Sequence, residues 1–263
     1  MRVLVTGAGG FIGSHLCPAL AAAGHEVRAS VQGCDAVVHL ANIAHAVVDE
    51  AELRRVNVEG TRRQAEQTAS ANVRRFVYLS SAKAAAPDDA YARAKLSAEH
   101  ALAGIAGLDA VVLRPPLVYG SGVKANFLAL LRAIDRGWPL PLASIENRRS
   151  LVYVGNLCDA IIRCLEAPQA PGNTYFVSDG APVTTPQLCR LLGNALGRPA
   201  RLFAFPPALL ELLAGERAMR LTRSLEVDDS AIRQDLRWRP PYTLEEGLRA
   251  TAAWYRERGA QRG

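Results

Sequence analysis

The chain has 263 residues, of which 49% are hydrophobic, and a net charge of +6 that comes almost wholly from dispersed arginines. This length allows one large domain or a domain that carries a smaller lobe. The longest apolar runs are too short to span a membrane, and the sequence has no block of basic residues of the kind that binds nucleic acid. We therefore expect neither a membrane nor a nucleic acid as a partner. Met1 leads directly into an apolar run, which leaves no room for a secretory signal and predicts the cytoplasm.

Metal-binding side chains are scattered along the sequence. Five cysteines occur without a CxxC pair, and His39 and His45 have no companion ligands at metal-site spacing. Unpaired cysteines are typical of a reduced compartment. We therefore expect neither a disulfide framework nor a metal site.

Strand and helix patterns alternate in the first half of the chain. Strands are predicted at 2–6, 26–31, 36–40, 75–80 and 110–114, and helices at 11–23, 53–70 and 91–103. The strands are continuous apolar runs such as AVVHL and FVYL, as expected when both faces of a sheet are covered. The sequence therefore predicts an α/β fold with a Rossmann-type doubly wound parallel sheet.

The pattern becomes less regular after the two prolines at 115 and 116. A helix is predicted at 126–136, strands at 151–154 and 174–177, and a mostly helical tail from 185 to 256. This change predicts a dinucleotide-binding domain over 1–118, to which 148–180 returns. Residues 119–147 and 181–263 are predicted to form a smaller, mostly helical substrate-binding lobe.

A glycine-rich turn, TGAGGFIG, joins the first strand to the first helix. Gly7 permits a tight turn, Gly10 lets backbone amides approach a pyrophosphate, and Gly13 allows the helix to pack closely on the strand. The N-terminus of the helix adds partial positive charge. A glycine-rich turn can be no more than a turn, but at this junction it favours dinucleotide binding.

The acid that contacts the adenosine ribose should follow the second strand, about 20 residues after the glycines. Asp35 has this spacing, but it begins the next apolar strand and is predicted to have a structural role there. The end of the second strand holds Ser30, Val31 and Gln32, with no carboxylate. A 2′-phosphate would not be repelled, so NAD and NADP both remain open.

Tyr91 and Lys95 are four residues apart in AYARAKLSAEH and would share one face of a helix. A free phenol is a poor acid or base at pH 7 unless positive charge lowers its pKa. Ser81 ends the strand FVYLSS just before this helix, and the carboxyl ends of parallel strands line the ligand crevice. In isolation each feature fits surface or capping residues, but the ordered set of glycine turn, Ser81, Tyr91 and Lys95 indicates a catalytic site.

With these motifs the chain resembles the extended short-chain dehydrogenases/reductases, in particular nucleotide-sugar epimerases and 4-keto-sugar reductases. DAVVHLAN, NVEGT, LRPPLVYGSG and NRRSLVYVGNL add to the similarity, which covers nearly the whole chain. The resemblance implies that Tyr91 is the acid/base, that Lys95 binds the nicotinamide ribose and lowers the tyrosine pKa, and that Ser81 bonds the reacting oxygen. The resemblance also implies which residues contact the ligands. The cofactor would be contacted by Phe11, Ile12, Leu40, Ala41 and Asn57. The nucleotide diphosphate of the substrate would be contacted by Asn126 and Arg149.

The function implied by the resemblance is hydride transfer at carbon 4 of a nucleotide sugar, with UDP as the expected nucleotide. A 4-epimerase and a 4-keto-sugar reductase of surface-polysaccharide synthesis share this machinery, and both stay open, as does the choice between NAD and NADP. A homodimer is also implied. Two alternatives are a non-catalytic redox regulator that binds NAD(P), and a reductase of a hydrophobic, non-sugar substrate.

The stretch VRASVQGCDAVVHLAN departs from the family pattern, which has a helix, an edge strand and a second helix at this point. Local turn rules predict a β-hairpin here. The resemblance instead makes the two apolar runs the second and fourth strands of a parallel sheet, which four residues should not connect. The loop between Ser81 and Tyr91 is also short. We therefore expect mobile residues to be missing from the printed sequence at both places.

Overall fold

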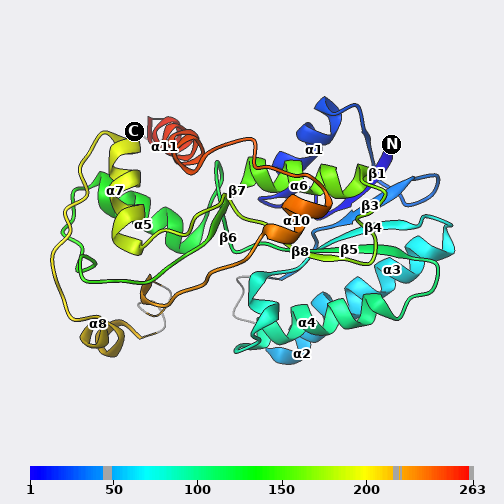
Figure 1. Ribbon diagram of the computed structural model, residues 1–263, viewed down its shortest axis with the longest axis horizontal. Coiled ribbons are helices and arrows are strands. Elements are labelled where there is room, and N and C mark those ends of the chain that lie inside the picture. The colour runs from blue at the N-terminus through cyan, green and yellow to red at the C-terminus, as the bar shows by residue number, and fades with distance from the viewer. Residues whose placement is uncertain (44–48, 216–218, 220, 261–263) are drawn as a thin grey trace. The chain divides into compact units, whose positions relative to one another are not determined.

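The structure, a computed structural model, describes residues 1–43, 49–215, 219 and 221–260, so His45 lies outside the described residues. The chain divides into two compact units (Figure 1). The first unit contains residues 1–116, 155–177 and 228–240, and the second contains 117–154, 178–227 and 241–263.

A six-stranded parallel sheet forms the centre of the first unit and confirms the predicted fold class. Its order is β2-β1-β3-β4-β5-β8. The strands are β1 (Arg2–Thr6), β2 (Glu26–Arg28), β3 (Ala36–His39), β4 (Arg75–Leu79), β5 (Asp109–Arg114) and β8 (Thr174–Phe176). All four residues of β3 are buried, as expected of a strand covered on both faces.

Helices cover both faces of this sheet. Figure 1 shows α1 (Gly13–Ala22), α6 (Val154–Glu166) and α10 (Ser230–Asp235) on one side, and α3 (Gly60–Ser70) and α4 (Ala90–Ala103) on the other. The short α2 (Glu50–Leu53) and the π-helical η1 (Arg54–Glu59) precede α3, and the 3₁₀ turn η2 (Ala82–Ala85) precedes α4. Leu4, Val37 and Phe76 from the sheet share one buried cluster with Ala65 of α3 and Ala98 of α4.

The second unit has a two-stranded parallel sheet, β6 (Leu117–Tyr119) with β7 (Leu151–Tyr153). Its helices are α5 (Ala125–Asp135), α7 (Thr185–Leu196), α8 (Pro207–Ala214) and α11 (Leu244–Ala260). Helix α7 begins at a capping box formed by Thr184 and Gln187 and ends at Gly197, whose φ is +63°. It packs against both α5 and α11.

The unit boundaries differ from the predicted domains by two or three residues at 117–118 and 178–180, and over two longer segments. Residues 148–154 fall in the second unit, because β7 pairs with β6 and not with the central sheet. Residues 228–240 fall in the first unit, because α10 packs against β8 and the indole N–H of Trp238 donates to Asp159 at 2.8 Å.

The stretch that resembles a hairpin is not one. Strands β2 and β3 both pair in parallel with β1, on opposite sides of it. In the structure residues 29–35 connect them through a turn in which the Cys34 amide donates to the Val31 carbonyl at 3.1 Å. That residues are missing from the sequence between them stays a prediction. The connection can be short because β2 ends level with Leu4 and β3 begins level with Val3, so the chain returns by only about one residue along β1 as it crosses that strand.

The second short loop is also continuous in the structure. Ser81 caps η2, where its hydroxyl oxygen accepts from the Lys83 amide at 3.3 Å, and the Ala84 amide donates to the Ser81 carbonyl at 3.0 Å. Asp89 then begins α4 as its N-cap, accepting from the Ala92 amide at 2.7 Å, and is paired with Lys83. A hydrogen-bonded turn therefore connects Ser81 to α4, and the expectation that residues are missing here stays a prediction.

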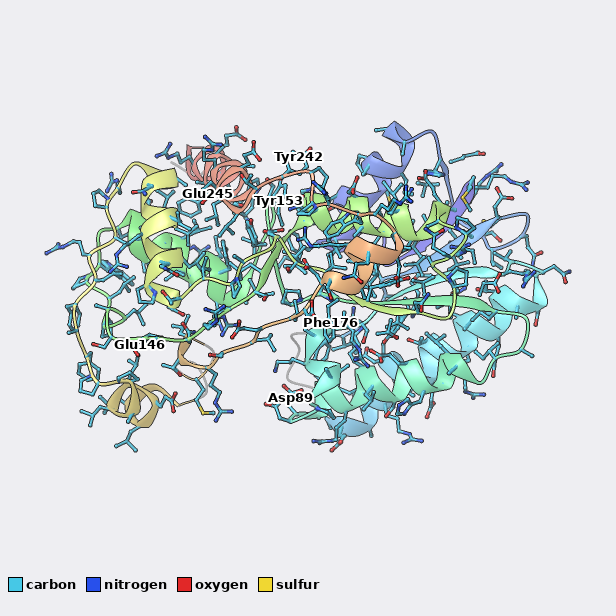
Figure 2. The ribbon with its side chains drawn as sticks, viewed as in Figure 1. Asp89, Glu146, Tyr153, Phe176, Tyr242 and Glu245 are labelled. Atoms are coloured by element: carbon cyan, nitrogen blue, oxygen red, sulfur yellow. The ribbon has the colours of Figure 1, made fainter. Side chains whose placement is uncertain are left out.

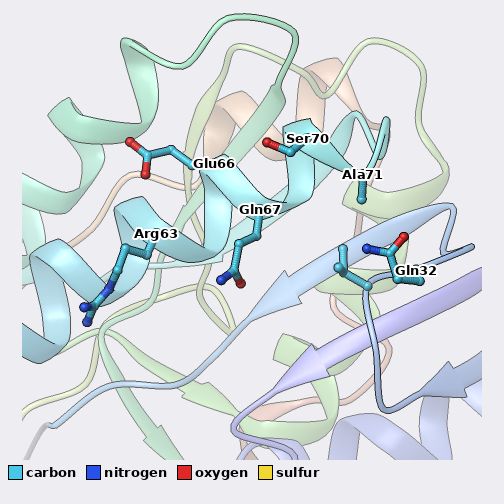
Figure 3. A pocket seen from close by; sticks show the side chains of 7 residues that line it. Gln32, Arg63, Glu66, Gln67, Ser70 and Ala71 are labelled. Carbon is cyan, nitrogen blue, oxygen red and sulfur yellow. The ribbon is translucent and has the colours of Figure 1, made fainter.

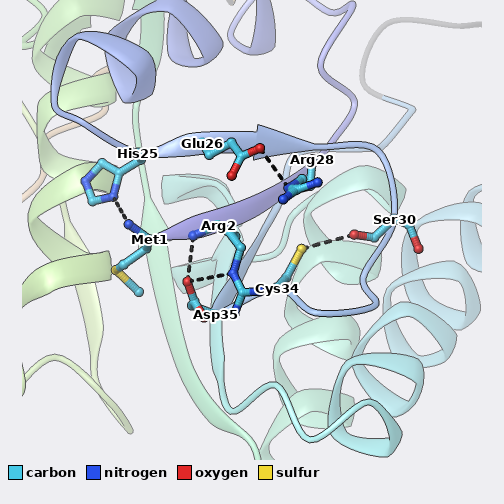
Figure 4. A network of polar contacts seen from close by, with 8 residues as sticks. All are labelled: Met1, Arg2, His25, Glu26, Arg28, Ser30, Cys34 and Asp35. Carbon is cyan, nitrogen blue, oxygen red and sulfur yellow. Dashed lines mark hydrogen bonds and ion pairs between the residues drawn. The ribbon is translucent and has the colours of Figure 1, made fainter.

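The chain between β2 and β3 lines a groove of about 490 Å³ on its side toward α3 (Figure 3). The groove is lined by Val31, Gln32, Arg63, Glu66, Gln67, Ser70 and Ala71. On the edge strand β2, the side chains of Glu26 and Arg28 are exposed and paired at 3.0 Å (Figure 4). This edge strand therefore presents charged side chains to water.

Candidate active site

The glycine turn after β1 is fixed by close backbone contacts. Gly7 has a φ of +73°, a conformation that favours glycine, and its carbonyl accepts from the Gly10 amide at 2.9 Å. A Cβ on Gly13 would lie 2.4 Å from the Gly7 carbonyl oxygen and 2.6 Å from the Ala8 Cα. Gly13 therefore lets α1 pack directly on the turn, as predicted.

The N-terminus of α1 presents unused hydrogen-bond donors. Ile12 is the N-cap and its side chain makes no capping bond. Within the described chain, no acceptor is bonded to the Phe11 or Ile12 amide. Free amides at a helix N-terminus, next to glycines without side chains, fit a pyrophosphate. The residues present at this turn therefore fit a dinucleotide.

Asp35 does not take part in this turn. Its carboxylate accepts from the Arg2 amide at 2.7 Å and from the Arg2 guanidinium at 2.9 Å, at the opposite end of β1 (Figure 4). The guanidinium holds the pKa of Asp35 at about 2. The structural role predicted for Asp35 is confirmed.

The loop after β3 lies against the glycine turn. The Ala41 amide donates to the Thr6 hydroxyl at 3.3 Å, and a Cβ on Gly7 would meet the Ala41 nitrogen at 2.9 Å. Asn57, fully buried in η1, holds the far side of this loop: its Oδ1 accepts from the Ile43 amide at 2.8 Å and its Nδ2 donates to the Ile43 carbonyl at 2.9 Å. Asn57 thus shapes the loop that contains Leu40 and Ala41, and a direct cofactor contact stays a prediction.

His39, which its sequence pattern predicts to be a packing or polar-edge residue, lies at the end of β3 between Thr6 of β1 and Thr61 of α3. Its Nδ1 lies 2.8 Å from the Thr6 hydroxyl and its Nε2 lies 3.1 Å from the Thr61 hydroxyl. Burial, with a smaller effect of Lys95, lowers the pKa of His39 to about 4, so the ring is neutral at pH 7. The apolar strand AVVHL hides this role, because both partners are distant in the sequence.

Tyr91 and Lys95 occupy one face of α4, as their spacing predicts. Lys95 is 1% exposed, and its ammonium donates to the Leu79 carbonyl at the end of β4 at 2.7 Å. Its Nζ lies 4.8 Å from the centre of the Tyr78 ring and 6.0 Å from the centre of the Tyr91 ring. The helix therefore places a buried cation beside the candidate acid/base.

In the protein alone, Tyr91 does not have the lowered pKa that the resemblance implies. Burial, together with the carboxylate of Asp89 at the N-terminal end of α4 (Figure 2), raises its pKa to about 12. Burial also lowers the pKa of Lys95 to about 7, against the opposing effect of Glu99. The expected lowering of the tyrosine pKa is therefore absent from the protein alone and requires further positive charge.

Ser81 stands where β4 ends, and η2, which it caps, packs against α4. Asn126 and Arg149 belong to the second unit. Asn126 is exposed in the first turn of α5, and Arg149 donates from Nη1 to the Arg223 carbonyl at 3.0 Å. Burial lowers the pKa of Arg149, so it is not the solvated residue that its neighbour Arg148 suggests.

Comparison with known proteins identifies the family. The family described as NAD dependent epimerase/dehydratase matches residues 3–32 and 28–178. The chain belongs to this family. The two matched segments meet at the connection between β2 and β3, where the sequence departs from the family pattern.

Individual proteins are also similar to this chain over most of its length. A UDP-glucose 4-epimerase of Vibrio cholerae is 35% identical over 308 aligned positions, with 95% of this chain and 94% of the relative covered. A 3 beta-hydroxysteroid dehydrogenase/Delta 5-->4-isomerase of Mycobacterium tuberculosis is 28% identical, with 97% and 90% covered. The structure of RMD from Pseudomonas aeruginosa complexed with NADPH matches with a TM-score of 0.80 at 24% identity, with 97% and 99% covered, and supports the fold.

Family membership makes this chain an NAD-dependent, epimerase-type enzyme. In the part of the chain that the structure describes, no three histidine, cysteine, aspartate or glutamate side chains gather as metal ligands would. None of its described helices is long and apolar enough to cross a membrane.

Proposed function

We propose that this enzyme transfers a hydride between NAD(P) and carbon 4 of a UDP-linked hexose, as a 4-epimerase or a 4-keto-sugar reductase. The observation that carries the proposal is the buried Lys95 beneath Tyr91, on a helix whose N-terminal end packs against the turn capped by Ser81. The 35% identical relative, a UDP-glucose 4-epimerase, supports the substrate class.

The proposed roles follow from the chemistry of each side chain. Tyr91 takes the proton from the C4 hydroxyl, or returns it, while Ser81 donates a hydrogen bond to the same oxygen. Lys95 holds the nicotinamide ribose, and its charge favours the phenolate. When bound, the nicotinamide supplies hydride transfer, and the positive charge of its oxidised ring offsets the raised pKa of Tyr91.

The second strand favours the reductase over the epimerase only weakly. It ends without a carboxylate near the position where an adenosine ribose is contacted, which is compatible with the 2′-phosphate of NADPH. A panel of UDP-hexoses and UDP-4-keto-6-deoxyhexoses separates the two. A 4-epimerase inverts C4 and leaves the cofactor unchanged, and a reductase oxidises NAD(P)H only with the 4-keto sugar.

A hydrophobic substrate is the second candidate, because a steroid dehydrogenase is 28% identical over most of its length. Arg149 distinguishes the two substrate classes, since a guanidinium offers paired donors to a diphosphate. We expect Arg149→Ala to abolish UDP binding measured by calorimetry, with Arg148→Ala as the matched control. Unchanged UDP affinity in Arg149→Ala would favour the hydrophobic substrate.

A non-catalytic redox regulator is the third candidate, and it predicts NAD(P) binding without turnover of any sugar. The proposal also includes a homodimer, a cytoplasmic location and a place in surface-polysaccharide synthesis. The five free cysteines support a reducing compartment. Light scattering of the purified protein tests the dimer, and a monomer at micromolar concentration would contradict it.

A further inference from the structure

A carboxylate, Glu99, continues the line of Tyr91 and Lys95 on α4. Glu99 follows Lys95 by four residues, which places the two side chains on the same face of the helix, about one turn apart. Glu99 is 9% exposed, although a carboxylate is seldom buried unless it is paired. Its burial beside the candidate site calls for a physical reason.

The carboxylate of Glu99 is held by residues from two strands. Its Oε1 accepts from the Ser80 hydroxyl at the end of β4, and from Arg114 Nε of β5 at 3.0 Å. Its Oε2 accepts from Arg114 Nη2 at 2.5 Å. The Arg114 guanidinium also lies over the Phe176 ring, with its Cζ 5.7 Å from the ring centre. The position of the Glu99 carboxylate is therefore fixed by the sheet.

The other groups that face Lys95 are neutral at pH 7. They are the Leu79 carbonyl and the Tyr78 ring of β4, the Tyr91 ring of α4, and His39 of β3. Among the described residues, Glu99 is the one carboxylate that acts on the charge of Lys95. Arg114 stands behind Glu99 and offsets part of its negative charge.

We propose that Glu99 is a positioning residue that keeps the buried Lys95 protonated, with Arg114 and Ser80 holding its carboxylate in place. The inference rests on the proposed function, in which a charged Lys95 holds the nicotinamide ribose. Burial alone would favour a neutral lysine near pH 7, and Glu99 opposes this effect. Without the carboxylate charge, Lys95 would lose its proton at a lower pH.

Cofactor binding as a function of pH tests the inference without an activity assay. We would titrate NADH fluorescence from pH 6 to 9 with the wild-type protein, Lys95→Met and Glu99→Gln, and with Glu66→Gln as a control on an exposed carboxylate of α3. Wild-type affinity is expected to fall as Lys95 loses its proton, and Lys95→Met should lack this fall. Glu99→Gln should move it to lower pH by about one unit, the lower end of the effect of a nearby opposite charge, and Glu66→Gln should not move it.

The outcomes separate this inference from the proposed function. If Lys95→Met removes the fall in affinity but Glu99→Gln leaves its midpoint in place, the role of Glu99 is overturned and the proposed function stands. If Lys95→Met retains the fall, the role of Lys95 fails and the inference fails with it. If Glu99→Gln does not fold because Arg114 is left unpaired, the double variant Glu99→Gln/Arg114→Met removes the pair together and should show the same direction of shift.

Discussion

Charged pairs are exposed at one edge of the central sheet and buried in its middle. At the β2 edge, the pairs Arg2–Asp35 and Glu26–Arg28 are between 39% and 58% exposed in their side chains. Between β4, β5 and α4, Glu99 and Arg114 are 8% and 17% exposed. Exposed pairs contribute little to stability, whereas a buried pair is costly once one partner is lost. The exposed pairs therefore lie at the edge where the connection between strands is short. The buried pair lies beside the candidate catalytic residues Tyr91 and Lys95.

The largest effect is expected when the phenol hydroxyl of Tyr91, which lies beside the buried charges, is removed. We expect Tyr91→Phe to lower kcat by about 10²–10⁴-fold, the usual contribution of a general acid or base. Turnover is measured on the active UDP-sugar, and NADH affinity should stay within a few-fold of wild type. Wild-type turnover in Tyr91→Phe would remove this residue from the mechanism.

The glycine turn allows a matched pair of substitutions. Gly13→Ala places a Cβ 2.4 Å from a backbone oxygen, so we expect a loss of about 3 kcal/mol of unfolding free energy and weaker NADH binding. Gly9→Ala meets no atom within 4 Å and should leave both quantities unchanged. Urea unfolding and NADH titration measure the difference. Equal behaviour of the two variants would contradict the close packing of α1 on the turn.

The buried His39 predicts that stability depends on pH. Its pKa is lowered to about 4 in the folded state, while an unfolded histidine titrates near 6.5. Between these values the unfolded chain binds more protons, so stability is present above pH 6.5 and is lost as the pH falls toward 4. From pH 7 to 5 we expect a loss of about 2 kcal/mol in unfolding free energy.

His39→Asn should remove most of this slope, because the titrating ring is gone. His100→Gln, at an exposed histidine of α4, should retain it. Urea unfolding at pH 5 and pH 7 gives the comparison. A wild-type slope that His39→Asn does not change would assign the pH dependence to other groups.

The smallest effect is expected at the β2 edge. Ser30→Asp introduces a carboxylate where none now follows β2, and it should disfavour the 2′-phosphate of NADPH by about 1 kcal/mol, or about fivefold in relative affinity. The ratio of NADPH to NADH dissociation constants measures it, with Ser30→Asn as the uncharged control. An unchanged ratio would place the ribose away from this strand.

The sequence predicted β1 with its observed bounds and α4 to within one residue, because both have strong local patterns. It overestimated β2, predicted at 26–31, because Val31 extends the strand-like pattern past Arg28, while the chain leaves the sheet after Arg28 to reach β3. Helix α6 was missed, although Leu157, Cys158, Ile161 and Leu165 recur with a helical period and are buried. The role of Glu99 could not be predicted, because its partners Ser80 and Arg114 come from two other elements.

The most direct measurement follows deuterium placed at carbon 4 of a UDP-hexose incubated with the enzyme and NAD or NADP. We predict that Tyr91-dependent chemistry moves the label, either to the inverted carbon 4 of the product or onto the nicotinamide, as read by NMR. A label that stays in place, in unchanged sugar across a panel of UDP-hexoses, would contradict the proposed reaction.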